Sequence, residues 1–285
     1  MRKLQMIIAV ALLSIISCQT KNLQQDEENP DAYELSSIEQ QADIVRLLEQ
    51  NKLGKAERAI HKLFKSDTVS IGYLILKGRL ERRKGNDELA EKYYLACLKM
   101  DSLFAFAYVG LASIYNLNGD YKKGLQSINK AIQIDSTDMD FYNERSAIYY
   151  NMNKYQEAYD DIKKAYLKHP GDEYLIHNMG TALNALNRYE EAIEYLDITH
   201  TLNPKEPRNY FDRGIAYYYT DQPEKAIADF RKALKYNDRA IKSDRIELNK
   251  IYYMLSHAYD QLNDTNRRND FRIKEKNYLK RDSIR

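Results

Sequence analysis

The most constraining feature of this sequence is a pattern that recurs every 34 residues without a gap. Four consecutive blocks show it most clearly, and the same frame extends backwards through two more. After an inserted segment at 241–248, a seventh block begins near Asn249. A fixed period of this length indicates stacked helical or strand units rather than one irregular core. The clear blocks are Ala105–Asp138, Met139–Asp172, Glu173–Glu206 and Pro207–Ala240, and the earlier ones are Ile71–Phe104 and Ser37–Ser70.

Small and large side chains alternate at fixed positions of each block. Small residues stand at positions 8 and 20, and large ones at position 24, which predicts two helices that approach closely. The chain has only 10 Gly and 5 Pro, and this scarcity favours long helices joined by short turns. The residues are Gly78, Ala112, Ser146, Gly180 and Gly214 at position 8, Ala56, Ala90, Gly124, Ala158, Ala192 and Ala226 at position 20, and Ile60, Tyr94, Ile128, Ile162, Leu196 and Phe230 at position 24.

This period and this pattern resemble the tetratricopeptide repeat (TPR), a helix–turn–helix unit. The resemblance implies an all-α fold, a TPR solenoid of about seven helix–turn–helix repeats, with six units in register over residues 37–240. The pattern weakens at both ends, where a solenoid needs a polar outer face because no neighbour covers it. We therefore interpret residues 249–285 as a divergent capping repeat with a basic C-terminal helix.

The N-terminus predicts a lipid anchor. Arg2 and Lys3 precede an apolar run that is too short to span a bilayer and is typical of a signal peptide. Residues 1–18 end in Ile15-Ile16-Ser17-Cys18, which resembles the lipobox of bacterial lipoproteins and implies lipidation of Cys18. The alternative is an ordinary secretory signal whose cleavage site contains a cysteine. Residues 19–36 hold few apolar side chains, and we predict that they form a flexible tether.

Charge and motifs exclude several classes of function. Without residues 1–18 the chain holds 42 basic and 42 acidic residues, so its body carries no electrostatic footprint for nucleic acid. The five histidines have no metal-ligand spacing, and the chain has no phosphate loop or nucleophile elbow. We predict no catalytic residue, no metal site, no cofactor and no enzymatic activity. Acidic pairs such as Asp160-Asp161 are interpreted as solvent-facing, and Cys97 as a core residue.

The basic C-terminal segment leaves two interpretations open. Thr265–Arg285 holds eight basic and three acidic residues, which fits a solvating cap on the last repeat. The alternative is a tail that binds a membrane or an acidic partner.

The first helix of each repeat is expected to line a concave surface that binds a partner. Positions three and four residues apart share one helix face, so each repeat presents a stripe of side chains. The middle of this surface is rich in amides and hydroxyls suited to an extended peptide, and its C-terminal end is apolar. The alternative is that the aromatic rings cover one another or a neighbouring helix. The predicted partner-binding residues are Asn143, Tyr150, Tyr174, His177, Asn178, Thr181, Asn184, Phe211, Ile215, Tyr218, Tyr253 and His257.

Lipobox and repeats together resemble TPR lipoproteins of the Gram-negative outer membrane. Some of these help to assemble pilus secretins, and others are scaffolds for peptidoglycan hydrolases. The resemblance implies a lipid-anchored adaptor or scaffold that binds a protein or peptide in the bacterial cell envelope. A structural protomer that self-associates into a homo-oligomer within an envelope assembly is the alternative. Neither the partner nor the face of the membrane follows from the sequence.

Overall fold

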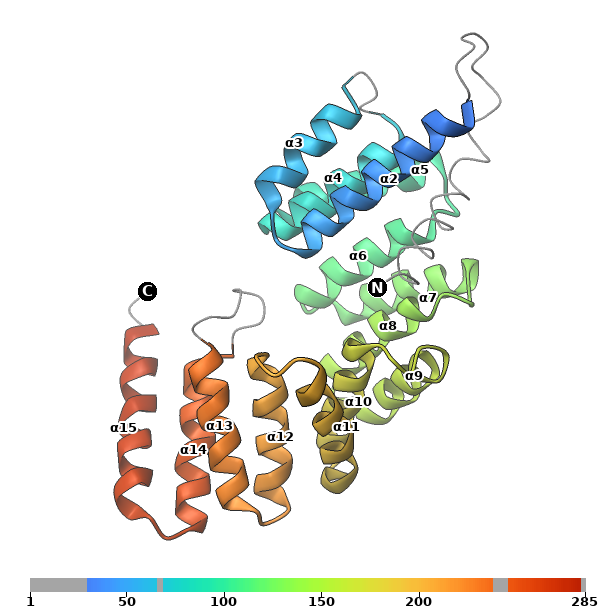
Figure 1. Cartoon of the computed structure of the whole chain (residues 1–285). Helices are drawn as coiled ribbons and strands as arrows, with labels where there is room; N and C mark the ends of the chain where they lie inside the picture. Colours follow the sequence, from blue (N-terminus) through green and yellow to red (C-terminus); the bar gives the residue numbers. More distant parts are fainter. Residues whose placement is uncertain (1–29, 66–68, 238–245, 283–285) are drawn as a thin grey trace. The chain divides into compact units, whose positions relative to one another are not determined.

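The computed structural model describes residues 30–65, 69–237 and 246–282, and all regular structure within these ranges is helical (Figure 1). Cys18, the predicted signal peptide and most of the predicted insertion at 241–248 lie outside the described residues. The chain divides into two compact units, Met1–Thr137 and Asp138–Arg285, and each is described by itself.

The described helices form consecutive antiparallel pairs, as the repeat pattern predicts. We refer to the first helix of each pair as helix A and to the second as helix B. Unit 1 contains α2 (Pro30–Glu49), α3 (Leu53–Leu63), α4 (Ile71–Lys84), α5 (Asp87–Met100), α6 (Ala105–Leu117) and α7 (Tyr121–Ile134). Unit 2 contains α8 (Met139–Asn151), α9 (Tyr155–Lys168), α10 (Glu173–Ala185), α11 (Tyr189–Leu202), α12 (Pro207–Tyr219), α13 (Pro223–Asn237), α14 (Leu248–Gln261) and α15 (Thr265–Asp282).

The start of each repeat is fixed by a helix cap. Helices α4, α6, α8, α10 and α12 begin at position 1 of their blocks. The residue before them, position 34 of the preceding block, is a capping type at four of these five starts. Its side chain accepts a backbone N–H of the first helical turn at Ser70, Asp138, Asp172 and Glu206. These caps satisfy donors that the helix itself leaves without a partner.

The turn between helices A and B is equally regular. Position 15 of every repeat has a positive φ, a conformation that Gly adopts freely and that Asn and Asp tolerate better than other residues. These residues are Asn51, Gly85, Gly119, Asn153, Asn187, Asp221 and Asn263. The series includes Asn263, so the block that begins at Asn249 follows the same register as the others.

The core is built from small residues of helix A against large ones of helix B. A Cβ atom placed on Gly180 would lie 2.6 Å from Leu196, and one on Gly214 would lie 2.7 Å from Phe230. The Tyr94 ring packs against both Gly78 and Gly110. A Cβ atom placed on either glycine would lie 2.5 Å from this ring. Every large residue at position 24 is 4% exposed or less. The predicted interleaving of small and large side chains is therefore confirmed.

Two buried ion pairs join the helices of a pair, and the sequence analysis did not predict them. Arg213 Nε and Nη2 donate to both carboxylate oxygens of Asp229, at 2.7 and 2.9 Å. Arg145 contacts Asp161 in the same way, at 2.7 and 2.8 Å. Asp161 is only 3% exposed, so its interpretation as a solvent-facing residue is wrong. It stands at position 23, beside the core position 24, and the guanidinium opposite makes its burial tolerable.

The N-terminal end of the repeat array differs from the predicted boundary, whereas the C-terminal end follows it. Helix α2 begins at Pro30, so the predicted tether at 19–36 ends sooner and the first helix A starts before Ser37. Proline is favoured in the first turn of a helix, and the residues after it contain no glycine that would interrupt one. At the other end, α14 and α15 form the predicted capping pair, and Phe271 of α15 is buried against Tyr252 and Tyr259 of α14.

Candidate protein-binding face

The predicted partner-binding residues of unit 2 all lie on its A helices, α8, α10, α12 and α14. We call the surface that these helices form the helix-A face. Direct side-chain contacts link neighbouring A helices across it. Asn178 Nδ2 of α10 donates to Asn143 Oδ1 of α8 at 2.9 Å, and His177 Nε2 of α10 lies 2.9 Å from Asp212 Oδ2 of α12. Both pairs are 35 residues apart, so position 5 of one repeat contacts position 6 of the next.

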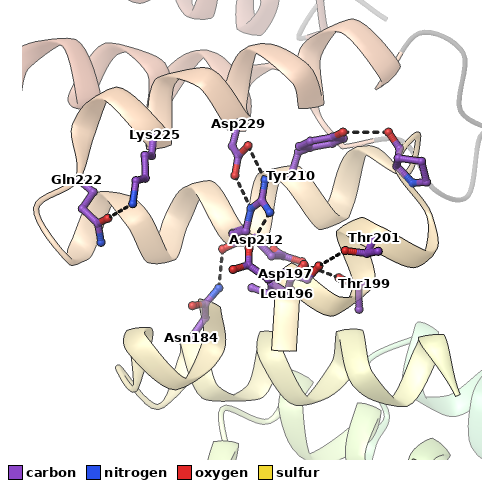
Figure 2. Close-up of polar contacts among 12 residues, drawn as sticks. Asn184, Leu196, Asp197, Thr199, Thr201, Tyr210, Asp212, Gln222, Lys225 and Asp229 are labelled. Atoms are coloured by element: carbon purple, nitrogen blue, oxygen red, sulfur yellow. Dashed lines mark hydrogen bonds and ion pairs between the residues drawn. The ribbon is translucent and has the colours of Figure 1, made fainter. Parts of the chain in front are cut away.

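Asp212 is the centre of a polar cluster on this face. Because a carboxylate oxygen only accepts, the His177 Nε2 must carry the proton in their contact. Thr181 Oγ1 lies 3.4 Å from Asp212 Oδ2 and 3.1 Å from the His177 carbonyl oxygen, so its one proton has two acceptors. Asn184 Nδ2 donates to the backbone oxygen of Asp212 at 2.8 Å (Figure 2). Helices α10 and α12 are thus joined by three polar side chains of α10 around a single acid of α12.

The cluster keeps acceptors on the surface of the protein. His177 and Asp212 side chains are both 18% exposed, so a partner can reach them. Asn184 Oδ1 is buried and has no hydrogen-bond partner among the described residues. An acceptor left in this way costs about 1–3 kcal/mol.

Tyr150 of α8 extends this cluster towards the preceding repeat. Desolvation, followed by the negative charge of Asp212, raises the pKa of Tyr150 to about 12. The hydroxyl is therefore protonated at neutral pH and remains a donor. Its ring meets that of Tyr155 edge to face, with centroids 5.3 Å apart, and the side chain is 36% exposed. Tyr174, at the start of α10, is 78% exposed and is the most accessible ring of the face.

The apolar end of the face is more buried than the sequence analysis predicted. Phe211, Ile215 and Tyr218 are partly buried and pack against the core, and the Phe211 ring lies 5.7 Å from that of Phe230. Phe211 and Tyr218 therefore pack against neighbouring side chains, as the alternative for the aromatic rings describes, and Ile215 is partly buried against the same cluster. The reason is local: Gly214 at position 8 brings α12 so close to Phe230 that residues one turn away also reach it.

Tyr253 is the exposed ring at this end. It is 49% exposed and packs on His257 with a centroid distance of 4.3 Å. Beside it is an open hollow of about 280 Å³, lined by Phe211, Asn249, Lys250, Tyr253, Met254 and Glu275. Such a hollow has the size for one anchoring side chain.

Asp212 was absent from the predicted set although a signal for it exists in the sequence. The prediction treated each helix A as a separate stripe at positions 2, 5, 9 and 12. The pairing of positions 5 and 6 across neighbouring repeats becomes evident only from the stacking of the helices. An offset of 35 residues, one more than the period, would have paired Asp212 with His177 and Asn178 with Asn143.

Other candidate chemistry is not assembled in the described part of the chain. Within residues 30–65, 69–237 and 246–282, no group of three or more His, Cys, Asp or Glu side chains is arranged to hold a metal ion. None of the helices described there combines the length and apolar character that crossing a membrane requires. Cys97 is fully buried, and desolvation raises the pKa of its thiol to about 12, as suits a core residue rather than a nucleophile.

Comparison with known proteins agrees with this architecture. Two family models described as tetratricopeptide repeat match four segments, residues 71–102, 107–138, 174–197 and 207–240. The TPR repeat-containing protein MJ1428 of Methanocaldococcus jannaschii is 24% identical over 247 residues, which cover 79% of this chain and 40% of that protein. The chain spans 40% or less of the length of each of the curated relatives that it matches.

Two solved structures share the fold. A tetratricopeptide repeat protein from Parabacteroides merdae has a TM-score of 0.57 at 16% identity, with 86% of this chain and 93% of that one covered. PilW, described as a widely conserved type IV pilus biogenesis factor, has a TM-score of 0.63 at 15% identity, with 72% and 91% covered. At identities this low, the structural similarity shows a common fold and does not indicate a common partner.

Proposed function

Because the fold is a TPR solenoid and four segments match tetratricopeptide-repeat models, we propose that this chain is a lipid-anchored adaptor of the bacterial cell envelope that binds a protein segment on its helix-A face. The observation that carries the proposal is the polar cluster around Asp212. Buried or half-buried polar groups stabilise a repeat less than apolar packing would, so their concentration on one face favours a binding role. The repeat fold supports the same conclusion, since such repeats typically serve as non-catalytic scaffolds for other proteins.

We propose that the partner presents an extended backbone to this face. The Tyr150 hydroxyl offers a donor and the partly exposed Asp212 carboxylate an acceptor, and a peptide backbone requires both. Tyr174 lies at the start of α10 and Tyr253 on α14, and exposed rings are frequent energetic anchors of protein interfaces. The hollow beside Tyr253 would receive one apolar side chain of the partner.

Site-specific photocrosslinking in cells tests this face. A photoreactive amino acid replaces Tyr174 or Tyr253 on the helix-A face, or Leu167 on α9 as a matched exposed position, 70% exposed, on a B helix. We expect one discrete adduct from the helix-A positions, identified by mass spectrometry, and its loss when Asp212→Ala is added. Equal adducts from Leu167, or none from either helix-A position, would overturn the proposed face.

The lipid anchor is tested separately. The motif Ile15-Ile16-Ser17-Cys18 supports acylation of Cys18, and several acyl chains hold a protein on a membrane stably where one chain does not. We expect Cys18→Ser to remove metabolic labelling by a fatty-acid analogue and to release the protein from carbonate-washed membranes. Unchanged labelling of the variant would contradict the anchor and leave the binding face untouched.

A self-associating protomer is the second candidate, and exposed apolar residues on B helices favour it. Leu167, Ile198 and Leu202 of α9 and α11 are 70%, 45% and 53% exposed. Light scattering of the unlipidated chain over a range of concentrations distinguishes the two functions. A concentration-independent monomer supports the adaptor, whereas an oligomer that Leu167→Ser and Leu202→Ser dissolve supports the protomer.

A further inference from the structure

Helix α15 carries a basic stripe along one side. Arg272, Lys276 and Lys280 follow one another at intervals of four residues, so they lie along one side of the helix. All three are exposed. Phe271, by contrast, points into the core against α14 and is 8% exposed. The stripe therefore lies on the side of α15 that faces away from the repeat it caps.

Two apolar side chains border the stripe. Ile273 is 58% exposed and Leu279 is 46% exposed. Each stands three residues from Lys276, on opposite sides of the stripe, because successive residues of a helix are turned by about 100°. We call the five residues together, Arg272, Ile273, Lys276, Leu279 and Lys280, the α15 stripe.

Several acids of this region pair with basic residues outside the stripe. Arg267 pairs with Asp264 at 3.4 Å, Arg268 with Asp260 at 2.6 Å and Lys274 with Asp270 at 2.6 Å. Asp260 interacts first with Arg268, whose hydrogen bond lowers the pKa of the Asp260 carboxyl, and the charge of Arg272 makes a smaller contribution to the same shift. Among the described residues, no acid forms an ion pair with Arg272 or Lys276. Like charges four residues apart weaken a helix slightly, so an external anion would relieve a repulsion that the fold maintains.

The charge of this helix is also opposite to that of the rest of the chain. Residues 265–285 hold eight basic and three acidic residues, whereas residues 19–264 hold 34 basic and 39 acidic. A cationic patch on an otherwise acidic protein orients it towards an anionic surface.

We propose that the α15 stripe binds the surface of an anionic lipid bilayer. Exposed apolar residues among lysines and an arginine favour lipid over an acidic protein or polyanion. Their side chains can enter the headgroup region while the long basic side chains reach the phosphates. The contact would give the protein a second attachment to the membrane, distinct from the proposed anchor at Cys18. This proposal rests on the proposed function only in that it assumes a location at the cell envelope. The stripe itself is part of the described structure.

Vesicle binding of a chain that begins at Gln19 tests the stripe without the anchor. Every described helix lies after residue 29, so this chain keeps the whole described fold and carries neither signal peptide nor lipid. Co-sedimentation is measured with phosphatidylglycerol–phosphatidylcholine vesicles and with phosphatidylcholine alone. The test variant is Arg272→Gln, Lys276→Gln, Lys280→Gln. The control variant, Lys92→Gln, Lys99→Gln, Lys122→Gln, removes the same charge from exposed positions of α5 and α7.

We expect binding to the anionic vesicles that weakens with added salt, and none to phosphatidylcholine. The test variant should bind on the order of a hundredfold more weakly, since each basic residue near an anionic surface contributes about a fivefold factor. The control variant should bind as the parent does, and Ile273→Ser with Leu279→Ser should weaken binding while the salt dependence remains. Circular dichroism verifies that each variant is folded.

Three results would overturn the proposal. They are no binding of the parent chain to anionic vesicles, equal losses in the test and control variants, and binding to polyglutamate but not to vesicles. The last would assign the stripe to an acidic protein instead. None of these results bears on acylation of Cys18 or on crosslinks from the helix-A face, so failure of the stripe and failure of the proposed function are distinguishable.

Discussion

The buried ion pair between Arg213 and Asp229 provides a sharp test of how a repeat tolerates charge in its core. Arg213 is 8% exposed and Asp229 is 4% exposed. Two hydrogen bonds, at 2.7 and 2.9 Å, join them, and Arg213 Nη1 also contacts Asp197 at 2.7 Å. Removing one member leaves the other charge buried, which costs about 3–5 kcal/mol. The Asp197 contact adds about 1 kcal/mol or less, because its side chain is 52% exposed.

Another repeat of the same chain has uncharged residues at the same two positions. In the preceding repeat, Met179 and Tyr195 stand where Arg213 and Asp229 stand in this one. Met179 is 1% exposed, and Tyr195 packs against the same cluster. We therefore expect Arg213→Met and Asp229→Leu each to destabilise unit 2 by about 3–5 kcal/mol, and the double variant to lie within about 1.5 kcal/mol of the parent.

Urea unfolding of the chain from Gln19, followed by circular dichroism, measures the three variants as a double-mutant cycle. The slope of the transition must stay constant for the comparison to hold, because repeat arrays can lose cooperativity. Arg188 and Glu191 provide an exposed control with contacts of 2.6 Å. Arg188→Met should cost less than about 1 kcal/mol. Single variants as mild as this control, or a double variant that loses the sum of both, would refute the reasoning.

Further predictions concern single residues of the core. Ala192 is fully buried, so Ala192→Leu should overpack the helix pair and cost about 1–3 kcal/mol in urea unfolding, whereas Glu190→Leu on the exposed face should cost little. Burial, followed by the charges of Arg213 and Lys232, lowers the pKa of His200 below 6.5. The unfolded chain then binds the extra proton, so stability should fall as the pH drops through about 6.5, by at most about 1.4 kcal/mol per pH unit. His200→Phe should flatten this part of the profile, and an unchanged profile would contradict the assignment. In a Cys18→Ser chain, Cys97 should react with an alkylating reagent at the rate of unfolding, because its thiol is buried and its pKa is raised to about 12; fast labelling in buffer would show otherwise.

The sequence was sufficient for the fold because the repeat restates the same physical requirements several times. Small residues opposite large ones, capping side chains at position 34 and left-handed residues at position 15 recur with one period. A single glycine such as Gly180 predicts little alone, but its recurrence at position 8 predicts a close helix contact. The ends of the array lacked this redundancy. Helix α2 therefore begins earlier than predicted, where no periodic core position defines the boundary.

The buried charges could not be predicted from the same pattern, because they depart from it. Arg145 and Arg213 occupy position 7, which is Leu111 in one repeat of unit 1 and Met179 in unit 2. Nothing within either helix shows that the guanidinium turns inward rather than towards solvent. The acid that neutralises it stands 16 residues later, on helix B, and either residue alone is typical of a solvent face. Only the paired helices reveal that each makes the burial of the other tolerable.

The helix-A face illustrates a related limit, since its central residue was the one that sequence reasoning omitted. Spacing of three and four residues identifies which side chains of one helix share a face, and it placed His177, Thr181 and Asn184 together correctly. It does not specify the offset between neighbouring A helices. In this protein that offset is 35 residues and brings Asp212 to His177. The 34-residue period determines the scaffold. The contacts between neighbouring A helices join residues 35 apart, and this one-residue difference determines which side chains lie together on the face. A binding surface on stacked repeats is therefore best sought among pairs one residue longer than the period, where polar residues occupy both positions.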